Sequence, residues 1–186
     1  MSGMLILVIV LVVFGLLLVG IYNRLVALRQ NTNQAFSDID VQLKQRHDLI
    51  PNLVETVKGY ATHEKTTLDA VITARNSAVQ AHGVAEQGAA EGALSQALGK
   101  MFALAEAYPD LKANQGFQQL QAELSDIENK IAAARRFFNN AVSEYNTGAQ
   151  QFPASMLAGM FGFQPRTFFD VGPDRAAVEA APQVKF

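Results

Sequence analysis

The chain has 186 residues, enough for one domain and a short additional segment, and its 15 basic and 17 acidic side chains give a net charge of -2. So weak an overall field argues against nucleic-acid binding, which depends on clustered positive charge. Cysteine is absent, which excludes disulfides, thiol nucleophiles and thiolate metal ligands. The chain is rich in Ala, Gln, Asn and Leu and has no Trp, a composition that favours helices over strands.

The first element is an apolar run from Leu5 to Ile21 that contains only Leu, Ile, Val, Phe and Gly. As a helix it spans about 26 Å, close to the roughly 30 Å hydrocarbon core of a bilayer. No basic side chain precedes the run and no cleavage site follows Gly20, so a retained transmembrane helix is favoured over a signal peptide. Tyr22 stands where an aromatic residue of the membrane surface is expected, and Arg24 and Arg29 predict that the N-terminus faces outward and the body faces the cytoplasm.

Beyond the span, apolar residues recur at mostly three- and four-residue steps, which predicts a long amphipathic helix continuous with the span. Its stripe consists of Leu25, Leu28, Ala35, Ile39, Leu43, Ile50, Leu53 and Val57. Pro51 lacks an amide donor and crowds the carbonyl of His47, so we expect a bend at this point. Gly59 is expected to end the helix.

Three further helices are expected. Thr62 is a candidate N-cap for the second helix, and the glycines of residues 80–92 predict an interhelix loop and the weak start of the third helix. Tyr108 and Pro109 should end the third helix, and the fourth should run from about Asn114 towards Gln150. Short connections make consecutive helices double back. The predicted fold class is therefore all-α, an N-terminal transmembrane helix continuing into an elongated antiparallel bundle of about four helices.

After Gln150 large apolar residues are concentrated among prolines and glycines: Phe152, Met156, Leu157, Met160, Phe161 and Phe163. They either cover one end of the bundle or contact another subunit or the membrane, and we take them as a candidate oligomer contact. The final residues show no helical period and are predicted to form a flexible or partner-ordered tail. The chain is thus divided into a short exterior N-terminus (1–4), a transmembrane helix (5–22), a bundle (23–151), an apolar C-terminal segment (152–169) and a tail (170–186).

The sequence contains no recognisable catalytic motif, and none of its three histidines has a metal-ligand spacing. A hydrolase or metal site built from His47, His63 and Glu64 across the first hairpin is the one enzymatic alternative. No metal, cofactor or catalytic activity is predicted. Arg135 and Arg136 cannot both face a core, so at least one is expected to reach an acid such as Glu128.

Several blocks carry a resemblance to a known family. They are the N-terminal span, Leu49 to Val54, Lys58 to Tyr60, Ala74-Arg75, Tyr108 to Lys112 and the Ala-Arg-Arg segment at 134–136 that precedes Asn139. Their order and spacing resemble the LemA family over nearly the whole chain. The departures are Gln45, where a basic residue is usual, and Phe138, where a tyrosine usually precedes the asparagine. The resemblance implies a bacterial, membrane-anchored helical bundle with a short exterior N-terminus and without an established biochemical activity.

These observations predict a non-enzymatic scaffold that is anchored in the bacterial inner or plasma membrane and forms a homo-oligomer. The lipid bilayer is its expected partner, and nucleic acid is not. The alternative is a transmembrane signalling or adaptor subunit that passes a helix shift to an unidentified protein partner, with Pro51 as the bend.

Overall fold

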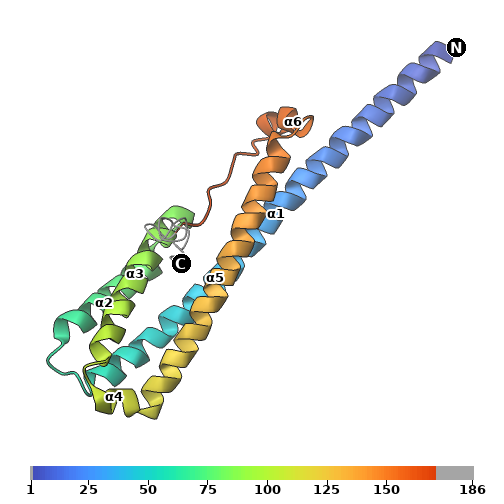
Figure 1. Cartoon of the computed structure of the whole chain (residues 1–186). Helices are drawn as coiled ribbons and strands as arrows, with labels where there is room; N and C mark the ends of the chain where they lie inside the picture. The colour runs from blue at the N-terminus through green and yellow to red at the C-terminus, as the bar shows by residue number, and fades with distance from the viewer. Residues whose placement is uncertain (1, 171–186) are drawn as a thin grey trace, which may run out of the picture.

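The computed structural model describes residues 2–170 and arranges them in six α-helices, with no strand in that range (Figure 1). The first, α1 (Ser2–Lys58), is one unbroken helix of 57 residues and is therefore about 85 Å long. Neither glycine nor proline occurs between residues 21 and 50, so nothing interrupts the helix where the predicted span meets the bundle. The helix ends at Lys58, immediately before Gly59, as predicted.

The second long helix, α5 (Gln115–Gln150), runs antiparallel beside α1 (Figure 1). It begins where the sequence predicts, because the side chain of Asn114 caps it by accepting a hydrogen bond of 2.9 Å from the amide of Phe117. Apolar side chains spaced at the helical period fill the seam between the two helices. Those buried there are Ala35, Ile39, Leu43, Ile127, Ile131, Phe138, Ala141 and Val142.

Two shorter helices, α2 (Lys65–Gln80) and α3 (Val84–Ala105), form a hairpin against the end of this pair that lies away from the span (Figure 1). A second core joins the hairpin to α1 and α5. Its largest buried members are Ile50, Leu53, Leu94, Leu98, Met101, Leu111 and Phe117. A short helix, α4 (Pro109–Ala113), leads into α5. Its first turn contains Pro109, where the missing amide proton costs no helical hydrogen bond.

One sequence prediction about the hairpin was wrong, and a second was correct only in part. The second helix begins at Lys65 with Glu64 at its flanking position, so Thr62 is not its N-cap. The connection before α3 is only residues 81–83, where Gly83 adopts φ +83°, and the glycines at 88 and 92 lie inside the helix. A side chain on Gly88 would collide with the backbone carbonyl of Asp170. The glycine therefore reflects a close approach of two backbones and not a loop.

The last helix, α6 (Ala154–Met160), packs against both α5 and α1, and the chain then returns in an extended path along α5 (Figure 1). We call residues 161–170 the return segment. Asn146 holds it by a pair of hydrogen bonds to the backbone of Arg166, at 2.9 and 2.8 Å. Asn139 holds the backbone of Phe169 in the same way, at 3.1 and 2.8 Å.

The spacing of this clamp follows from elementary geometry. The two asparagines are separated by two helical turns, about 10.5 Å at the helical rise, and their two backbone targets are separated by about 10 Å of extended chain. Each side-chain amide donates one hydrogen bond and accepts one, as a neighbouring strand would. The hydroxyl of Tyr145 adds a hydrogen bond of 2.9 Å to the carbonyl of Gln164.

The predicted fold class is confirmed: an N-terminal apolar helix continues into an antiparallel helical bundle, to which the structure adds the short α4 and α6. Pro51 lies inside α1, which remains helical through it, and a bend at that point stays a prediction. Beyond Asp170 the predicted tail lies outside the described residues.

Candidate functional site: a buried ion-pair network and an uncovered apolar end

A polar cluster interrupts the apolar stripe of α1. Arg46 and His47 lie between the core residues Leu43 and Ile50, on the face that points into the bundle, and are only 2% and 8% exposed. The stripe identified in the sequence skips from Leu43 to Ile50. That gap of seven residues was the available signal that polar side chains occupy a core position.

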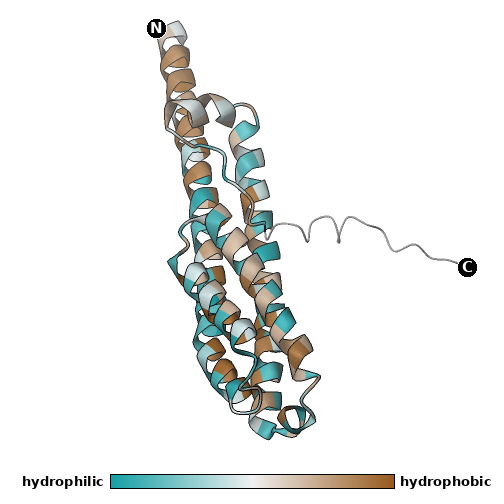
Figure 2. Ribbon diagram, turned by 90° about the vertical axis from the view of Figure 1, so that its left-hand side faces the viewer, coloured by the Kyte–Doolittle hydropathy of each residue, from teal (hydrophilic) through white to brown (hydrophobic). Residues whose placement is uncertain are grey.

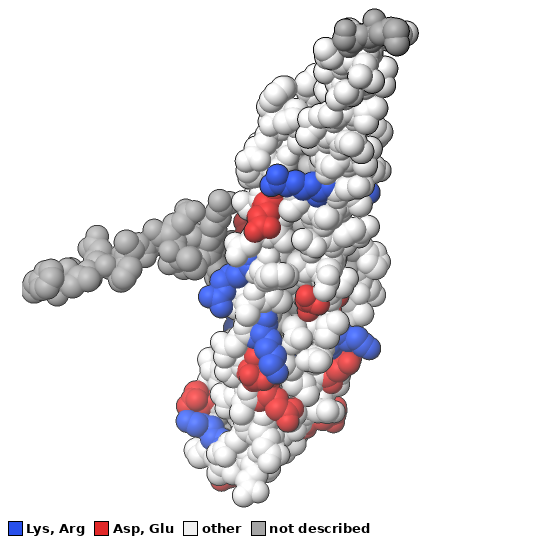
Figure 3. Space-filling model, turned by 90° about the vertical axis from the view of Figure 1, so that its right-hand side faces the viewer, with Lys and Arg blue, Asp and Glu red and all other residues white. Residues whose placement is uncertain are grey.

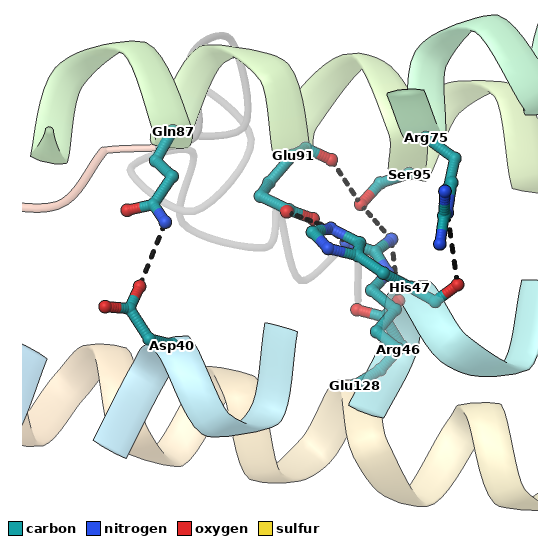
Figure 4. A network of polar contacts seen from close by, with 8 residues as sticks. All are labelled: Asp40, Arg46, His47, Arg75, Gln87, Glu91, Ser95 and Glu128. Carbon is teal, nitrogen blue, oxygen red and sulfur yellow. Dashed lines mark hydrogen bonds and ion pairs between the residues drawn. The ribbon is translucent and has the colours of Figure 1, made fainter. Parts of the chain in front are cut away.

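Glu91 of α3 is the partner of both residues (Figure 4). Its Oε2 lies 2.8 Å from Nη1 of Arg46, and its Oε1 lies 2.6 Å from Nε2 of His47. Glu91 is itself only 2% exposed, so one buried carboxylate uses both oxygens to hold two neighbouring side chains of α1. Glu91 lies in residues 80–92, which the sequence predicted to be a loop and the weak start of a helix, so its role was missed.

The other end of the Arg46 guanidinium connects the remaining helices. Its Nη2 donates to Oγ of Ser95 on α3 at 2.7 Å and lies 2.7 Å from Oε1 of Glu128 on α5. The sequence predicted that Arg135 or Arg136 reaches an acid, either Glu128 or one on a neighbouring helix. The ion pair of Glu128 is with Arg46, while Arg135 lies over the ring of Phe169 at 5.6 Å from its centroid.

Burial raises the pKa of the Glu128 carboxyl above its ordinary value. The positive charge of Arg46 opposes this rise, the negative charge of Glu91 adds to it, and the charge of Arg135 opposes it further. The net direction means that the folded protein holds the Glu128 proton more tightly than the unfolded chain does.

A further contact connects the network to Pro51. Proline has no amide proton, so it cannot donate the usual helical hydrogen bond to the carbonyl of His47, four residues before it. Arg75 of α2 supplies the missing donor: its Nε lies 3.3 Å from that carbonyl oxygen (Figure 4). Arg75 of α2 thus donates to the carbonyl of His47 the hydrogen bond that Pro51 of α1 cannot donate.

Ser95, His47 and Glu91 are residue types found in hydrolases, but their contacts do not follow a catalytic order. A nucleophilic hydroxyl needs the general base within hydrogen-bond reach. The Ser95 hydroxyl instead accepts from Arg46 and donates to the backbone carbonyl of Glu91, while the imidazole of His47 bonds to the carboxylate. These contacts instead connect α1, α3 and α5 and stabilise their packing.

The enzymatic alternative of His47, His63 and Glu64 is not assembled as a site. His47 is bonded to Glu91, and Glu64 accepts a hydrogen bond of 3.3 Å from the hydroxyl of Tyr108. Throughout residues 2–170, no group of three or more histidine or acidic side chains could hold a metal ion.

The predicted membrane span is uncovered over nearly its whole length. Leu5 is 63% exposed, as are most large apolar side chains up to Val19 to a similar degree, and nothing in the bundle packs on them. Figure 2 shows this part of α1 as an apolar helix that projects beyond the other elements. The first contacts come at Ile21, which packs against a small core around Leu25, and at Tyr22, which is 37% exposed.

The apolar C-terminal segment divides into two groups. Leu157 and Phe163 are buried within the same chain, as the bundle-covering interpretation requires. The other four predicted contact residues remain exposed: Phe152 at 82%, Met156 at 65%, Met160 at 78% and Phe161 at 55%. Only these four remain available for a partner, and no contact with another molecule tests that role.

Charge is absent from the same end of the molecule. On the face shown in Figure 3, the part nearest the N-terminus carries no Lys, Arg, Asp or Glu, and the first basic side chains appear below it. In the sequence the first charged side chain is Arg24. The structure therefore combines an uncharged, uncovered apolar end with a polar body.

Comparison with known proteins gives a consistent result. The sequence model described as the LemA family matches residues 35–186. The chain is 25% identical to the magnetosome protein MamQ of Magnetospirillum gryphiswaldense, over 94% of this chain and 74% of that protein. It is also 27% identical to the protein LemA of Metamycoplasma hominis, over 78% of this chain and 67% of that protein. Magnetosome protein MamQ 2 of Paramagnetospirillum magneticum is 25% identical over 88% of this chain and 70% of its own length.

Proposed function

Because this chain belongs to the LemA family, whose pattern covers most of it, we propose that it is a membrane-anchored scaffold without catalytic activity that self-associates close to the bilayer. The observation that carries the proposal is α1, in which an uncovered apolar span and the first bundle helix form one continuous rod. A rigid connection fixes the bundle relative to its anchor, as a structural protein requires. The relatives carry names that refer to a cell structure or to the family and not to a reaction.

Self-association through the span has a physical basis in its glycines. Nothing lies near a side chain added at Gly15 or Gly20, and a shallow apolar groove of about 370 Å³ surrounds Gly20. The groove is lined by Val13, Leu16, Leu17, Gly20, Ile21 and Arg24. Small residues let two transmembrane helices approach closely, so van der Waals packing between copies is available there. The subunit contact that the sequence predicts in residues 152–163 is untested, so the proposal of self-association rests on the span alone.

The first test is the mass of the protein in a mild detergent, measured by light scattering during size exclusion. The full-length chain is compared with a chain that begins at Ile21, because Ile21 and Tyr22 pack on the bundle and should be kept. We expect a discrete assembly for the full-length chain and a smaller mass without the span. Two monomers would refute self-association.

A matched pair of variants locates the contact. Gly20→Ile fills the groove of the span, whereas Gly3→Ile adds the same side chain to open space at the start of α1. We expect the first to reduce the mass of the assembly and the second to leave it unchanged. Equal effects would argue against helix packing at Gly20.

The alternative function, a transmembrane signalling or adaptor subunit, is favoured by one observation. The carbonyl of His47 receives no hydrogen bond from Pro51 and accepts one from Arg75, so a shift in α1 would displace α2 as well. Pro51→Ala would restore the helical hydrogen bond. A signalling subunit should no longer pass a helix shift to its partner in this variant, whereas a scaffold should keep the mass of its assembly.

The proposed location is the bacterial inner or plasma membrane, with the N-terminus outside and the bundle in the cytoplasm. A membrane location is supported by the uncovered apolar helix, and the orientation rests on Arg24 and Arg29.

A further inference from the structure

The short helix α6 lies beside the point where α1 enters its apolar span (Figures 1 and 2). Its inner face packs with Leu25 and Ile21 of α1 through Ala154 and Ala158. The ring of Phe161, just after α6, meets Tyr22 at 5.1 Å between centroids, and Phe163 meets the same ring at 5.7 Å. α6 is therefore attached at the level of residues 21–28 of α1.

That level corresponds to the surface of a bilayer. If Leu5 to Ile21 fill the hydrocarbon core, the next residues of α1 lie within about 10 Å of its boundary, at the rise of 1.5 Å per residue. This is the headgroup region, where short helices with one apolar face are found and where tyrosine is enriched.

The outer face of α6 has the composition such a location requires. Phe152, Met156, Met160 and Phe161 are more than half exposed, although Phe161 also contacts the ring of Tyr22. The surrounding segments, residues 2–37 and 145–169, contain no acidic residue and three arginines, Arg24, Arg29 and Arg166. Apolar side chains beside arginines suit the boundary between acyl chains and phosphate groups.

We propose that α6 and its flanking phenylalanines lie in the headgroup region of the bilayer that the span crosses, with these four side chains directed into lipid. The occupant of this apolar face is lipid and not a second copy, because the face is continuous with the span at the contact of Tyr22 with Phe161. The bundle then has two attachments to one membrane surface. Its tilt about the end of the span is restricted, although residues 2–170 contain only one helix able to cross the bilayer.

This inference rests on the proposed membrane anchor, so the test reports on both separately. The chain has no tryptophan, and each substitution therefore introduces a single fluorescent reporter. Phe161→Trp reports on α6, and Phe14→Trp, 58% exposed in the wild type, reports on the span. Phe137→Trp is the matched control, because Phe137 is 59% exposed on α5, away from the predicted membrane.

The three full-length proteins are reconstituted in phosphatidylcholine and phosphatidylglycerol vesicles that contain lipids with a nitroxide quencher either near the headgroup or deep in the acyl chain. We expect the shallow quencher to remove most fluorescence at position 161, with an emission maximum shifted to the blue of position 137. The deep quencher should act on position 14, and neither should act on position 137. Far-UV circular dichroism confirms folding, and Phe152→Trp, at the most exposed of the four sites, serves as a second reporter.

Deep quenching at position 14 without shallow quenching at positions 161 and 152 would overturn the inference and leave the membrane anchor intact. Loss of quenching at position 14 would remove the anchor and the inference together. A blue shift at position 161 that is insensitive to lipid quenchers and disappears when the protein is diluted with empty vesicles would show a second copy in place of lipid.

Discussion

At the scale of residues, charged side chains occupy core positions of the bundle that apolar side chains usually fill. Arg46 is 2% exposed and pairs with the buried Glu91 and the half-exposed Glu128. Buried ion pairs contribute little net stability, because desolvation offsets much of their attraction, but removal of one partner leaves an uncompensated charge. The network is therefore best understood as fixing the register of three helices.

The hydrogen bond from Arg75 to the carbonyl of His47 can be tested by a double-mutant cycle. Arg75→Ala should lower the free energy of unfolding by about 1 kcal/mol in the wild type, because it leaves that carbonyl without a donor. In the Pro51→Ala background the new amide at position 51 serves the same carbonyl, so the loss should be smaller. Thermal and chemical unfolding of the full-length protein in mild detergent measures both. Equal losses would show that Arg75 acts independently of Pro51.

The raised pKa of Glu128 predicts a dependence of stability on pH. The folded protein binds this proton more tightly than the unfolded chain, so the contribution of Glu128 is fully present below its ordinary pKa. It declines as the pH rises through the interval up to the raised pKa. Relative to Glu128→Gln, which keeps an oxygen for Arg46, the wild type should therefore lose stability as the pH rises through that interval.

Unfolding curves across weakly acidic pH test this, with Glu123→Gln, an exposed acid on the same helix, as the control. A stability difference between wild type and Glu128→Gln that grows in favour of the wild type with rising pH would contradict the direction of the shift.

At the scale of elements, the return segment (161–170) connects α5 to the start of α3. The clamps of Asn139 and Asn146 recognise its backbone, and the buried Phe169 joins the core between α1 and α5. The carbonyl of Asp170 then approaches Gly88 of α3 so closely that no side chain fits between them. An extended segment of chain thus packs against the helices of the bundle.

Asn139→Ala should release the return segment at Phe169, because both hydrogen bonds to that backbone are lost. A loss of about 1.4 kcal/mol, within the range for two net hydrogen bonds, would speed amide exchange of Phe169 roughly tenfold. Hydrogen exchange read by mass spectrometry on the full-length protein measures this. Asn140→Ala, at the adjacent exposed position, should leave the exchange unchanged. An unchanged rate in Asn139→Ala would show that Phe169 alone holds the segment.

At the scale of the whole molecule, the absence of cysteine permits a direct test of orientation. Ser2→Cys places one thiol before the span, and Gln119→Cys places one on an exposed position of the bundle. If Arg24 and Arg29 hold the bundle in the cytoplasm, a membrane-impermeant maleimide should label the first protein in intact cells and the second only after lysis. The reverse pattern would place the bundle outside.

Much of the architecture followed from local patterns. The span was recognisable because hydrocarbon excludes charge over a fixed length, and the long helices because apolar residues recur at the helical period. Asn114 marked the start of α5 through a side-chain cap that acts within a few residues, and Gly59 marked the end of α1 without adopting a positive φ. The errors arose where a distant segment decided the outcome. Gly88 looked like a loop residue, although its lack of a side chain makes room for Asp170.

What the sequence by itself determined about this protein is its class, its family and the presence of an apolar helix long enough to cross a membrane, since these depend on periodicity, hydropathy and ordered local blocks. Only the tertiary structure decided which polar residues meet. Arg46 and His47 contact Glu91, which lies forty-five and forty-four positions further along the sequence. Asn139 bonds to the backbone of Phe169, thirty positions further along. A hydrogen bond depends on the positions of two atoms in space, and the separation of their residues along the chain carries no record of it.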